Sequence, residues 1–174
     1  MNQISIDQKV RNNKQNQPQR ISKRTLAETW TQLSQWPGGK WLFSKMIGRM
    51  APYSGTVSAY VRELELGRSV VEMKDRKAVR NHLKSVHAIA LLNLGELATG
   101  LCAMYGIDGR GRGIVKGIRI EYLKKARGTL TAHCSFVAPK EVGTHSVEVE
   151  GTIHNTNDEI VARVWVSWKL EIYA

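Results

Sequence analysis

The apolar positions of the chain first repeat with a helical period and later with a period of two. Residues 24–36, RTLAETWTQLSQW, predict a helix, because Thr25 precedes Glu28 by three positions as in a capping box. The apolar stripe of this helix consists of Leu26, Trp30 and Leu33. Pro37 and the two glycines after it end the helix, and residues 40–50, KWLFSKMIGRM, predict a second short one.

From Tyr53 onward the pattern indicates strands and one long helix. GTVSAYVREL and SVVEMKD predict two strands separated by Gly67. A long apolar helix is expected over about residues 84–105, ending at Gly106. Four more strands are predicted after it, in GIVKGIRIEYLKKA, GTLTAHCSFV, THSVEVEGTIHN and EIVARVWVSWKLEIY.

This order, β-β-α-β-β-β-β after two helices, predicts an α+β fold. A helix so long and so apolar must be covered, and one large curved sheet can wrap it. A length of 174 residues suits one domain with a sizeable core. We therefore expect a single sheet-and-helix domain over residues 53–174, with the helices of residues 24–52 packed on it.

Nearly half of the net positive charge lies in the N-terminal segment. The net charge is +11, and residues 1–24 contain six Lys or Arg against Asp7 alone. Residues 1–23 have too few apolar side chains to offset the entropy of ordering, so a disordered basic tail is expected. A basic chain favours anionic partners, although a solvated tail explains the charge equally well. Because aromatic and basic residues do not interleave, no nucleic-acid partner is expected.

The chain shows no targeting signal. It has no run of about 18 apolar residues, so no transmembrane segment is expected. Its start, MNQISIDQKVRNN, lacks an apolar stretch of signal-peptide length, and the expected location is cytoplasmic. The two cysteines, Cys102 and Cys134, are expected to be packed free thiols.

Glu96 is the most unusual residue in the pattern, because it lies in the middle of the apolar helix. A carboxylate is rarely buried unless a partner pairs with it or a reaction uses it. Asn93 or a cation from the sheet is one possible partner. The other interpretation is a desolvated, reactive carboxylate, with Asn81, His82 and His87 grouped near the helix start.

Several segments together resemble the hotdog-fold thioesterase superfamily. IEYLKKARGTLTA resembles the strand-turn-strand that follows the helix in its acyl-CoA thioesterases, and EIVARVWVSWKL resembles their final strand. Asn81, then His87-Ala88 after five residues, then Glu96 after seven, is similar to the Asn…His-Gly…Asp pattern of the phenylacetic-acid-degradation branch. Ala88 stands where that branch usually has Gly, and Glu96 where it usually has Asp. With PYSGT and RNHLKSVHAIAL, the chain looks most like an uncharacterised bacterial family related to this branch.

The resemblance implies an antiparallel sheet wrapped around one central helix, and an acyl-CoA thioesterase-like hydrolase. The substrate would be an acyl-CoA or acyl-carrier-protein thioester, with coenzyme A entering only as part of it, so no cofactor is expected. The backbone N–H groups of His87 and Ala88, at the positive helix end, would hold the developing oxyanion. Glu96 would activate water or attack the carbonyl, and Asn81 would position the water or the thioester.

The spacing of these groups requires two copies of the chain. Ala88 and Glu96 are eight residues apart, about 12 Å along a helix, so one thioester carbon cannot lie roughly 3 Å from both. A homodimer, or a tetramer built from dimers, with the site at its interface would bring the two groups together. The resemblance implies the same arrangement.

Two further features concern ligands. Lys124, Lys125 and Arg127 form a basic cluster at a predicted strand end, which would hold coenzyme A phosphates or an acidic carrier protein. A solvated turn explains the cluster equally well. His82 and His87 are five apart, about 140° around a helix, and make a poor metal pair, so no metal site is expected.

Two alternative functions stay open on the sequence. A non-catalytic acyl-binding or regulatory hotdog protein would share the fold and use the site only for binding. A hotdog dehydratase or isomerase would use His82 and Glu96, fourteen residues apart, but the proline-rich loop usual before the helix of those enzymes is absent.

Overall fold

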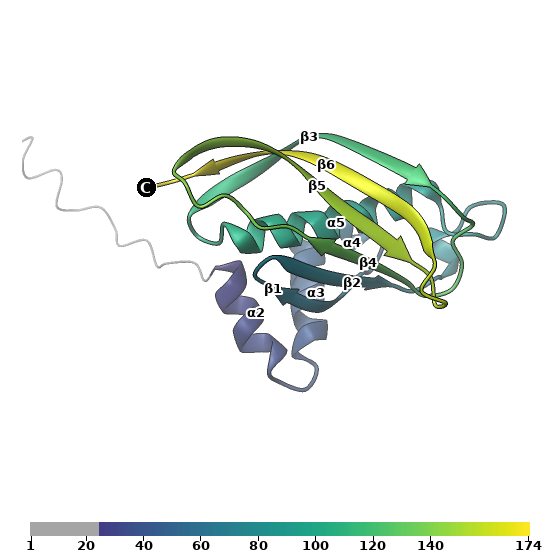
Figure 1. Cartoon of the computed structure of the whole chain (residues 1–174). Helices are drawn as coiled ribbons and strands as arrows, with labels where there is room; N and C mark the ends of the chain where they lie inside the picture. Colours follow the sequence, from purple (N-terminus) through teal and green to yellow (C-terminus); the bar gives the residue numbers. More distant parts are fainter. Residues whose placement is uncertain (1–24) are drawn as a thin grey trace, which may run out of the picture.

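An antiparallel sheet of six strands wraps around one long helix in the computed structural model, which describes residues 25–174 (Figure 1). The expected basic tail of residues 1–23 lies outside the described residues. The strands are β1 (Tyr60–Glu65), β2 (Arg68–Met73), β3 (Gly111–Tyr122), β4 (Leu130–Ser135), β5 (Gly143–His154) and β6 (Ile160–Ile172). The helices are α2 (Leu26–Ser34), α3 (Gly39–Met50), α4 (Pro52–Gly55) and α5 (Ala88–Gly106). The predicted α+β architecture is confirmed.

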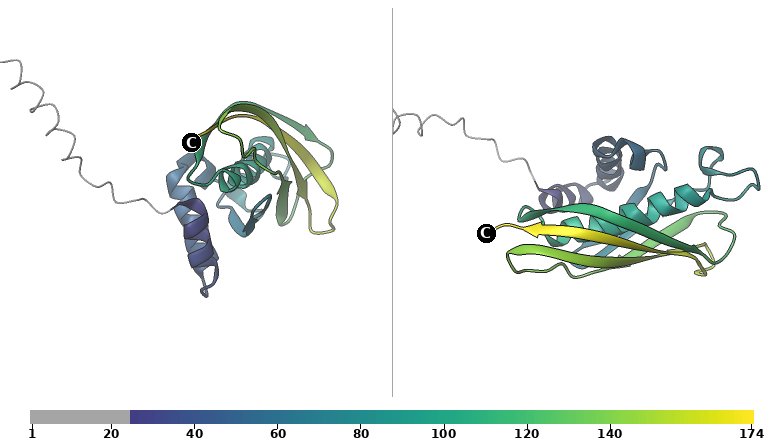
Figure 2. Two further views of the ribbon diagram at one scale, coloured as in Figure 1. Left: turned by 60° about the vertical axis from the view of Figure 1, so that its left-hand side comes forward. Right: turned by 90° about the horizontal axis from the view of Figure 1, so that it is seen from above.

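The sheet has the strand order β1-β2-β4-β5-β6-β3, and its curvature is clearest when it is seen end-on (Figure 2). Its inner surface is apolar because strand residues alternate between the two faces. On β6 the inward positions Ala162, Val164, Val166, Trp168, Leu170 and Ile172 are all buried. This strand also alternates in the sequence, as predicted, except that Val161 on the other face is buried as well.

Helix α5 packs against the inner surface of the sheet at close range. A Cβ on Gly95 would lie 2.4 Å from Cγ2 of Val164, so only glycine permits this approach. Cys102 on α5 and Cys134 on β4 are buried free thiols, as expected. Among residues 25–174, α5 alone is long and apolar enough to cross a membrane, but its packing in the sheet is that of a core helix.

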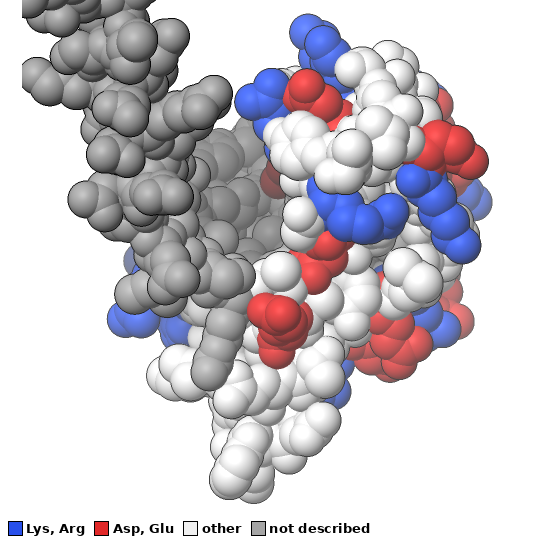
Figure 3. Space-filling model, turned by 90° about the vertical axis from the view of Figure 1, so that its left-hand side faces the viewer, with Lys and Arg blue, Asp and Glu red and all other residues white. Residues whose placement is uncertain are grey.

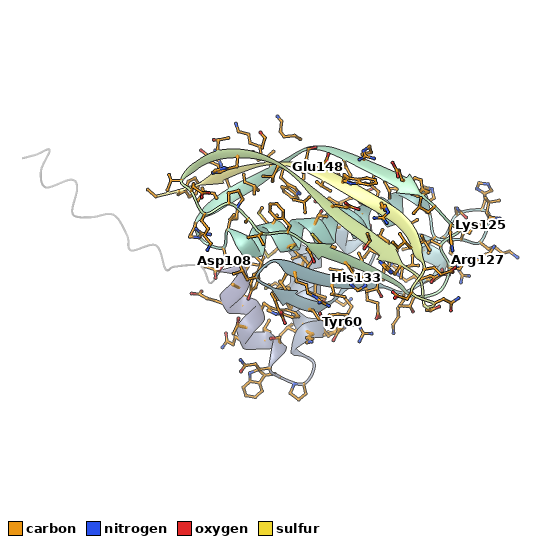
Figure 4. All side chains as sticks on the ribbon, viewed as in Figure 1. Tyr60, Asp108, Lys125, Arg127, His133 and Glu148 are labelled. Carbon is orange, nitrogen blue, oxygen red and sulfur yellow. The ribbon has the colours of Figure 1, made fainter. Side chains whose placement is uncertain are left out.

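The N-terminal helices pack beside the end of the sheet that carries β1. The capping box of α2 is confirmed: Thr25 Oγ1 accepts from the N–H of Glu28 at 3.2 Å. Asp108, after α5, accepts from the N–H of Ala27 at 3.1 Å and ties α2 to the domain (Figure 4). Ser44 Oγ of α3 accepts from the N–H of Val61 at 2.9 Å and ties α3 to β1.

Candidate active site

The start of α5 differs from the prediction, because the helix begins at Ala88 and not near residue 84. His87 is the N-cap residue: its backbone is extended, and its Nδ1 accepts from the N–H of Ile89 at 3.1 Å. The left-handed backbone of Lys84, with φ 56°, is incompatible with a helix at that point. His87 therefore has a structural role as the residue that sets the first turn.

Asn81 folds the loop that leads into α5. Its Oδ1 accepts from the N–H of Leu83 at 2.9 Å, and from the N–H and the hydroxyl of Ser85 at 3.2 and 3.1 Å. These bonds replace helical ones, which explains why the helix starts late. The side-chain oxygen of Asn81 is thus occupied, and its amide NH2 is the part left to meet a water or a thioester.

One backbone donor stays open at the helix start. The N–H of His87, expected as an oxyanion donor, donates instead to the carbonyl of Val79 at 2.8 Å, so that expectation is wrong. The N–H groups of Ala90 and Leu91 donate to the His87 carbonyl. Within residues 25–174 the N–H of Ala88 donates to no acceptor. Ala88 is therefore the one residue of this first turn that presents a free donor.

Tyr122 is a neighbour of this donor that the sequence did not single out. Its hydroxyl, at the end of β3, donates to the carbonyl of Ala88 at 3.1 Å. Partial burial raises the pKa of this phenol above its usual value. The contact fixes the end of the edge strand β3 beside the helix start, a pairing that the sequence pattern does not encode.

Glu96 is half-buried, and burial raises the pKa of its carboxyl above the usual range. Within the described chain its carboxylate forms no ion pair or hydrogen bond, and Asn93 donates instead to the carbonyl of Tyr53 at 3.2 Å. The expected alternative, a pairing with Asn93 or a sheet cation, is therefore absent there. A Cβ on Gly100 would lie 3.9 Å from Oε1 of Glu96 and 3.4 Å from Cζ2 of Trp168, so this glycine leaves space beside the carboxylate.

The carboxylate lies on a face of α5 that the sheet covers only in part. We call this the open face; it consists of the exposed or half-buried residues Ile89, Leu92, Glu96, Gly100 and Met104. They recur at helical spacing on one side, apolar apart from the carboxylate. Ile89 is 47% exposed, which departs from the expectation of a helix buried all round.

The edge strand β3 extends this uncovered surface. The β3 residues that pair in register with the inward residues of β6 point to the same side of the sheet, where the helix lies. Four of these positions carry exposed or half-buried side chains: Val115, Ile118, Ile120 and Tyr122. An apolar surface therefore runs from the open face of α5 across the inner side of β3.

A basic cavity of about 480 Å³ adjoins the loop before α5. It is lined by Lys74, Asp75, Arg80, Lys84, Arg127, Gly128 and Thr129. Asp75 binds Arg80 at 2.6 Å and the N–H of Gly128 at 3.1 Å, and the Arg80 guanidinium holds the pKa of the Asp75 carboxyl below its usual range. Four cations and one carboxylate make the cavity a suitable place for phosphate groups.

The predicted basic cluster is only partly assembled in this cavity. Arg127 lines it, whereas Lys124 pairs with Glu159 at 2.5 Å. Lys125 is exposed, and Figure 4 shows it at the same end of the molecule as Arg127. Lys74, Arg80 and Lys84, distant in sequence from Arg127, were not predicted as part of the site, because only the folded loops bring them together.

Metal-ligating side chains do not gather elsewhere in the described part of the chain. Residues 25–174 contain no group of three or more His, Cys, Asp and Glu side chains placed to hold a metal ion. On the face seen in Figure 3, Lys and Arg alternate with Asp and Glu. Such mixing is usual for a solvated surface.

The chain belongs to the family described as Domain of unknown function (DUF4442), whose model matches residues 39–170. No functionally curated protein matches it. Among solved structures it is similar to the genomics protein APC5556, with 29% identity, a TM-score of 0.70, and coverage of 84% of this chain and 98% of that one. The match to the phenylacetic-acid-degradation branch stays a prediction.

Two other similar structures have names that mention thioesterases. A Pseudomonas aeruginosa protein described as a probable thioesterase is 20% identical, with a TM-score of 0.69 and coverage of 79% of this chain and 97% of that one. A thioesterase enzyme from Staphylococcus aureus is 19% identical, with a TM-score of 0.61 and coverage of 69% and 98%. The hotdog fold shared with such proteins is thereby established for this chain.

Glu96→Gln should stabilise the protein at pH 8. Because the pKa of Glu96 is raised in the folded state, ionisation above that pKa destabilises the fold, and the glutamine removes this penalty. The variant should unfold at a higher Tm than wild type at pH 8, and the difference should vanish below about pH 4, where the carboxyl is protonated in both states. Glu148→Gln, at an exposed position without an ion pair in the described chain, is the control and should show no such gain. Destabilisation by Glu96→Gln at pH 8 would instead show that the carboxylate has a structural partner.

Proposed function

We propose that the protein hydrolyses acyl thioesters, of coenzyme A or of an acyl carrier protein, at a site shared by two copies of the chain. The observation that carries the proposal is the pairing of groups on α5: one free backbone N–H at Ala88 and one desolvated, unpartnered carboxylate at Glu96. An oxyanion donor and a base are the two groups that thioester hydrolysis needs. They are about 12 Å apart along the helix, so one chain alone cannot use both.

The uncovered apolar surface supports the dimer. β3 is a 12-residue edge strand with no neighbour on one side, and a long free edge favours pairing with another chain. The inner side of β3 and the open face of α5 form one continuous surface, of a kind that marks an interaction site. An isologous dimer would cover both elements at once.

Two-fold symmetry then predicts which residue lies on the axis. If the two α5 helices run antiparallel and Ala88 of one chain meets the partner subunit's Glu96, residues whose numbers add to the same total face one another. The midpoint between the two positions is Leu92. It lies on the open face and would pack against its own copy.

The chemistry follows from that arrangement. The thioester carbonyl oxygen accepts from the N–H of Ala88, where negative charge develops. The partner subunit's Glu96 takes a proton from a water molecule, whose oxygen attacks the carbonyl carbon. The tetrahedral intermediate collapses, the C–S bond breaks, the partner subunit's Glu96 returns its proton to the leaving thiolate, and the carboxylic acid dissociates. The amide NH2 of Asn81 is placed near the helix start to orient the water or the thioester.

The basic cavity supports the proposed substrate class. Arg80, Lys84 and Arg127 lie around it beside the loop that precedes Ala88. Phosphates of coenzyme A, or the phosphopantetheine and acidic surface of a carrier protein, match that charge. In this proposal Lys124 and Lys125 contribute long-range attraction, and Lys124 keeps its ion pair with Glu159.

A relative supplies a further parallel. Two structures of the Staphylococcus aureus thioesterase carry Gln→Ala and Glu→Ala substitutions fifteen residues apart in its chain. Asn81 and Glu96 here are an amide and a carboxylate in the same order at the same separation. The parallel supports these two positions as the place to test activity.

Thioester hydrolysis is the direct test, read as free thiol released from acyl-CoAs of varied chain length and from aryl-CoAs. Glu96→Gln should lower kcat by about 10²–10⁴-fold through loss of the base. Ala88→Pro should lower it by about 10²–10³-fold through loss of one oxyanion donor. Proline suits the first helical position, and the extended backbone of His87 suits the residue before proline. Saturable acyl-CoA binding without thiol release would favour the non-catalytic alternative.

Cross-linking tests the predicted axis. Leu92→Cys should form a disulfide-linked dimer under mild oxidation, because the two copies of residue 92 would face one another. Met104→Cys, on the same open face but twelve residues away, is the control, since its copies would lie about 36 Å apart along antiparallel helices. Non-reducing electrophoresis reads the result. Equal cross-linking of both variants, or of neither, would contradict the symmetric site.

A further inference from the structure

A second and larger cavity of about 990 Å³ lies between the N-terminal helices and the β1 side of the sheet, and neither Ala88 nor Glu96 is among its lining residues. We call it the α3–α4 cavity. Its lining includes Trp41, Lys45, Ile47, Arg49, Ala59 and Leu97. Figure 4 shows Tyr60, another lining residue, on the side of the sheet that carries α3. Its volume is at the upper end of the range for small-molecule sites.

The inner wall of the α3–α4 cavity is apolar. Ile47 and Val61 form its buried back, at 8% and 1% exposed, and the half-buried Ala59 and Leu97 present accessible apolar surface. The hydroxyl of Ser44 is already used, since it donates to the carbonyl of Lys40 and accepts from Val61. This wall therefore offers a ligand contact area and few hydrogen bonds.

Positive side chains strongly outnumber negative ones in the lining of the cavity. Its lining carries five cations, Lys45, Arg49, Arg62, Lys74 and Arg76, against the single carboxylate of Glu72. Glu72 is already paired with Arg62. Arg76 is held by the carbonyl of Thr56 and the hydroxyl of Ser58.

The two cations contributed by α3 are available at the rim. Lys45 and Arg49 are exposed, and neither forms an ion pair within residues 25–174. Lys45 Nζ lies 5.9 Å from the ring centre of Trp41, which is also exposed. An anion at this rim would meet positive charge that has no counter-ion in the described chain, and Trp41 would cover the adjoining apolar part of a ligand.

We infer that the α3–α4 cavity binds the anion of a long-chain fatty acid, with its carboxylate at Lys45 and Arg49 and its alkyl chain along the inner wall toward Leu97. An amphiphile with one anionic end matches an apolar wall with cations at the rim. A polar metabolite would leave the wall unused, and a neutral hydrocarbon would leave the cations unused. Each additional buried CH2 should tighten Kd by about two- to fourfold.

This site differs from the proposed hydrolytic one, although Lys74 lines both this cavity and the basic cavity. Neither Glu96 nor Ala88 lines the α3–α4 cavity, and the rim lies on α3. The inference therefore does not require hydrolysis to occur. An anionic membrane is the competing partner for the same cations, because Trp36, Trp41 and Met50 are exposed on this side of the chain. We favour a single fatty-acid molecule because a cavity of about 990 Å³ with apolar lining on α3, β1 and α5 has room for an alkyl chain that surface docking would not use.

Calorimetric titration of the full protein with oleate tests the inference. The oleate concentration is kept below that at which oleate itself aggregates. One saturable site per chain is expected. Lys45→Gln with Arg49→Gln should weaken Kd by about five- to tenfold, because two ion contacts are lost. The control pair, Lys116→Gln with Lys169→Gln, makes the same charge change at exposed positions of β3 and β6 and should leave Kd unchanged. Ala59→Phe, which fills the cavity, should weaken oleate more than decanoate.

Four outcomes would overturn the inference. They are the absence of saturable binding, equal weakening by the control pair, loss of oleate binding in Glu96→Gln, and binding only to phosphatidylglycerol vesicles. Loss of oleate binding in Glu96→Gln would place the fatty acid in the hydrolytic site. Binding only to vesicles would indicate a membrane-docking surface. A fifth outcome concerns the head group of the ligand. If oleoyl lysophosphatidic acid bound with a Kd more than tenfold tighter than that of oleate, the preferred ligand would be a phosphate lipid and not a fatty acid. Oleate binding retained in a hydrolytically inactive Glu96→Gln supports the inference whether or not wild type hydrolyses thioesters.

Discussion

The incomplete cover of helix α5 is the constraint on which the rest of the structure depends. Most of the nineteen residues of α5 are apolar and must be kept from water, and the sheet packs so closely on the helix that a Cβ on Gly95 would clash with Val164. The strands stop at β3, and one side of the helix stays open. Exposing this apolar surface to water is unfavourable. Burying the Glu96 carboxylate without a partner is also unfavourable, and this desolvation raises its pKa. A second chain would cover the surface, and catalysis would give the carboxylate a use.

The first turn of α5 converts this helix into a candidate site. Asn81 holds the preceding loop through its side-chain oxygen, and His87 caps the helix through Nδ1. Together with the Val79 carbonyl, they use the donors around the helix start and leave the N–H of Ala88 free. Residues that resemble catalytic ones in sequence thus act here first by shaping the backbone, and the donor in the proposed reaction is a backbone N–H group.

The fold was predictable because its periodicities are strong. The two-residue alternation of β6 and the apolar run of α5 leave one simple arrangement, and Thr25 with Glu28 marked the start of α2 correctly. The start of α5 was misplaced because apolar content does not reveal the bonds that Asn81 makes to Leu83 and Ser85.

The site was predictable only in part, for a similar reason. Glu96 stood out because a carboxylate in an apolar helix is rare. The basic cavity could not be predicted from the sequence, because Lys74, Arg80 and Arg127 come together only after two loops have folded around Asp75. Likewise, the use of the His87 N–H by Val79 depends on a contact between two loop segments that no spacing rule predicts.

Subunit complementation tests the shared site most directly. Glu96→Gln and Ala88→Pro each disable both sites of a homodimer. In a mixed dimer, one site receives both lesions and the other receives an intact Ala88 N–H and an intact carboxylate. Refolding equal amounts together makes about half of the dimers mixed, so thiol release should recover to about a quarter of the wild-type rate. No recovery, with mixed dimers confirmed by mass spectrometry, would contradict a site built from two copies of α5.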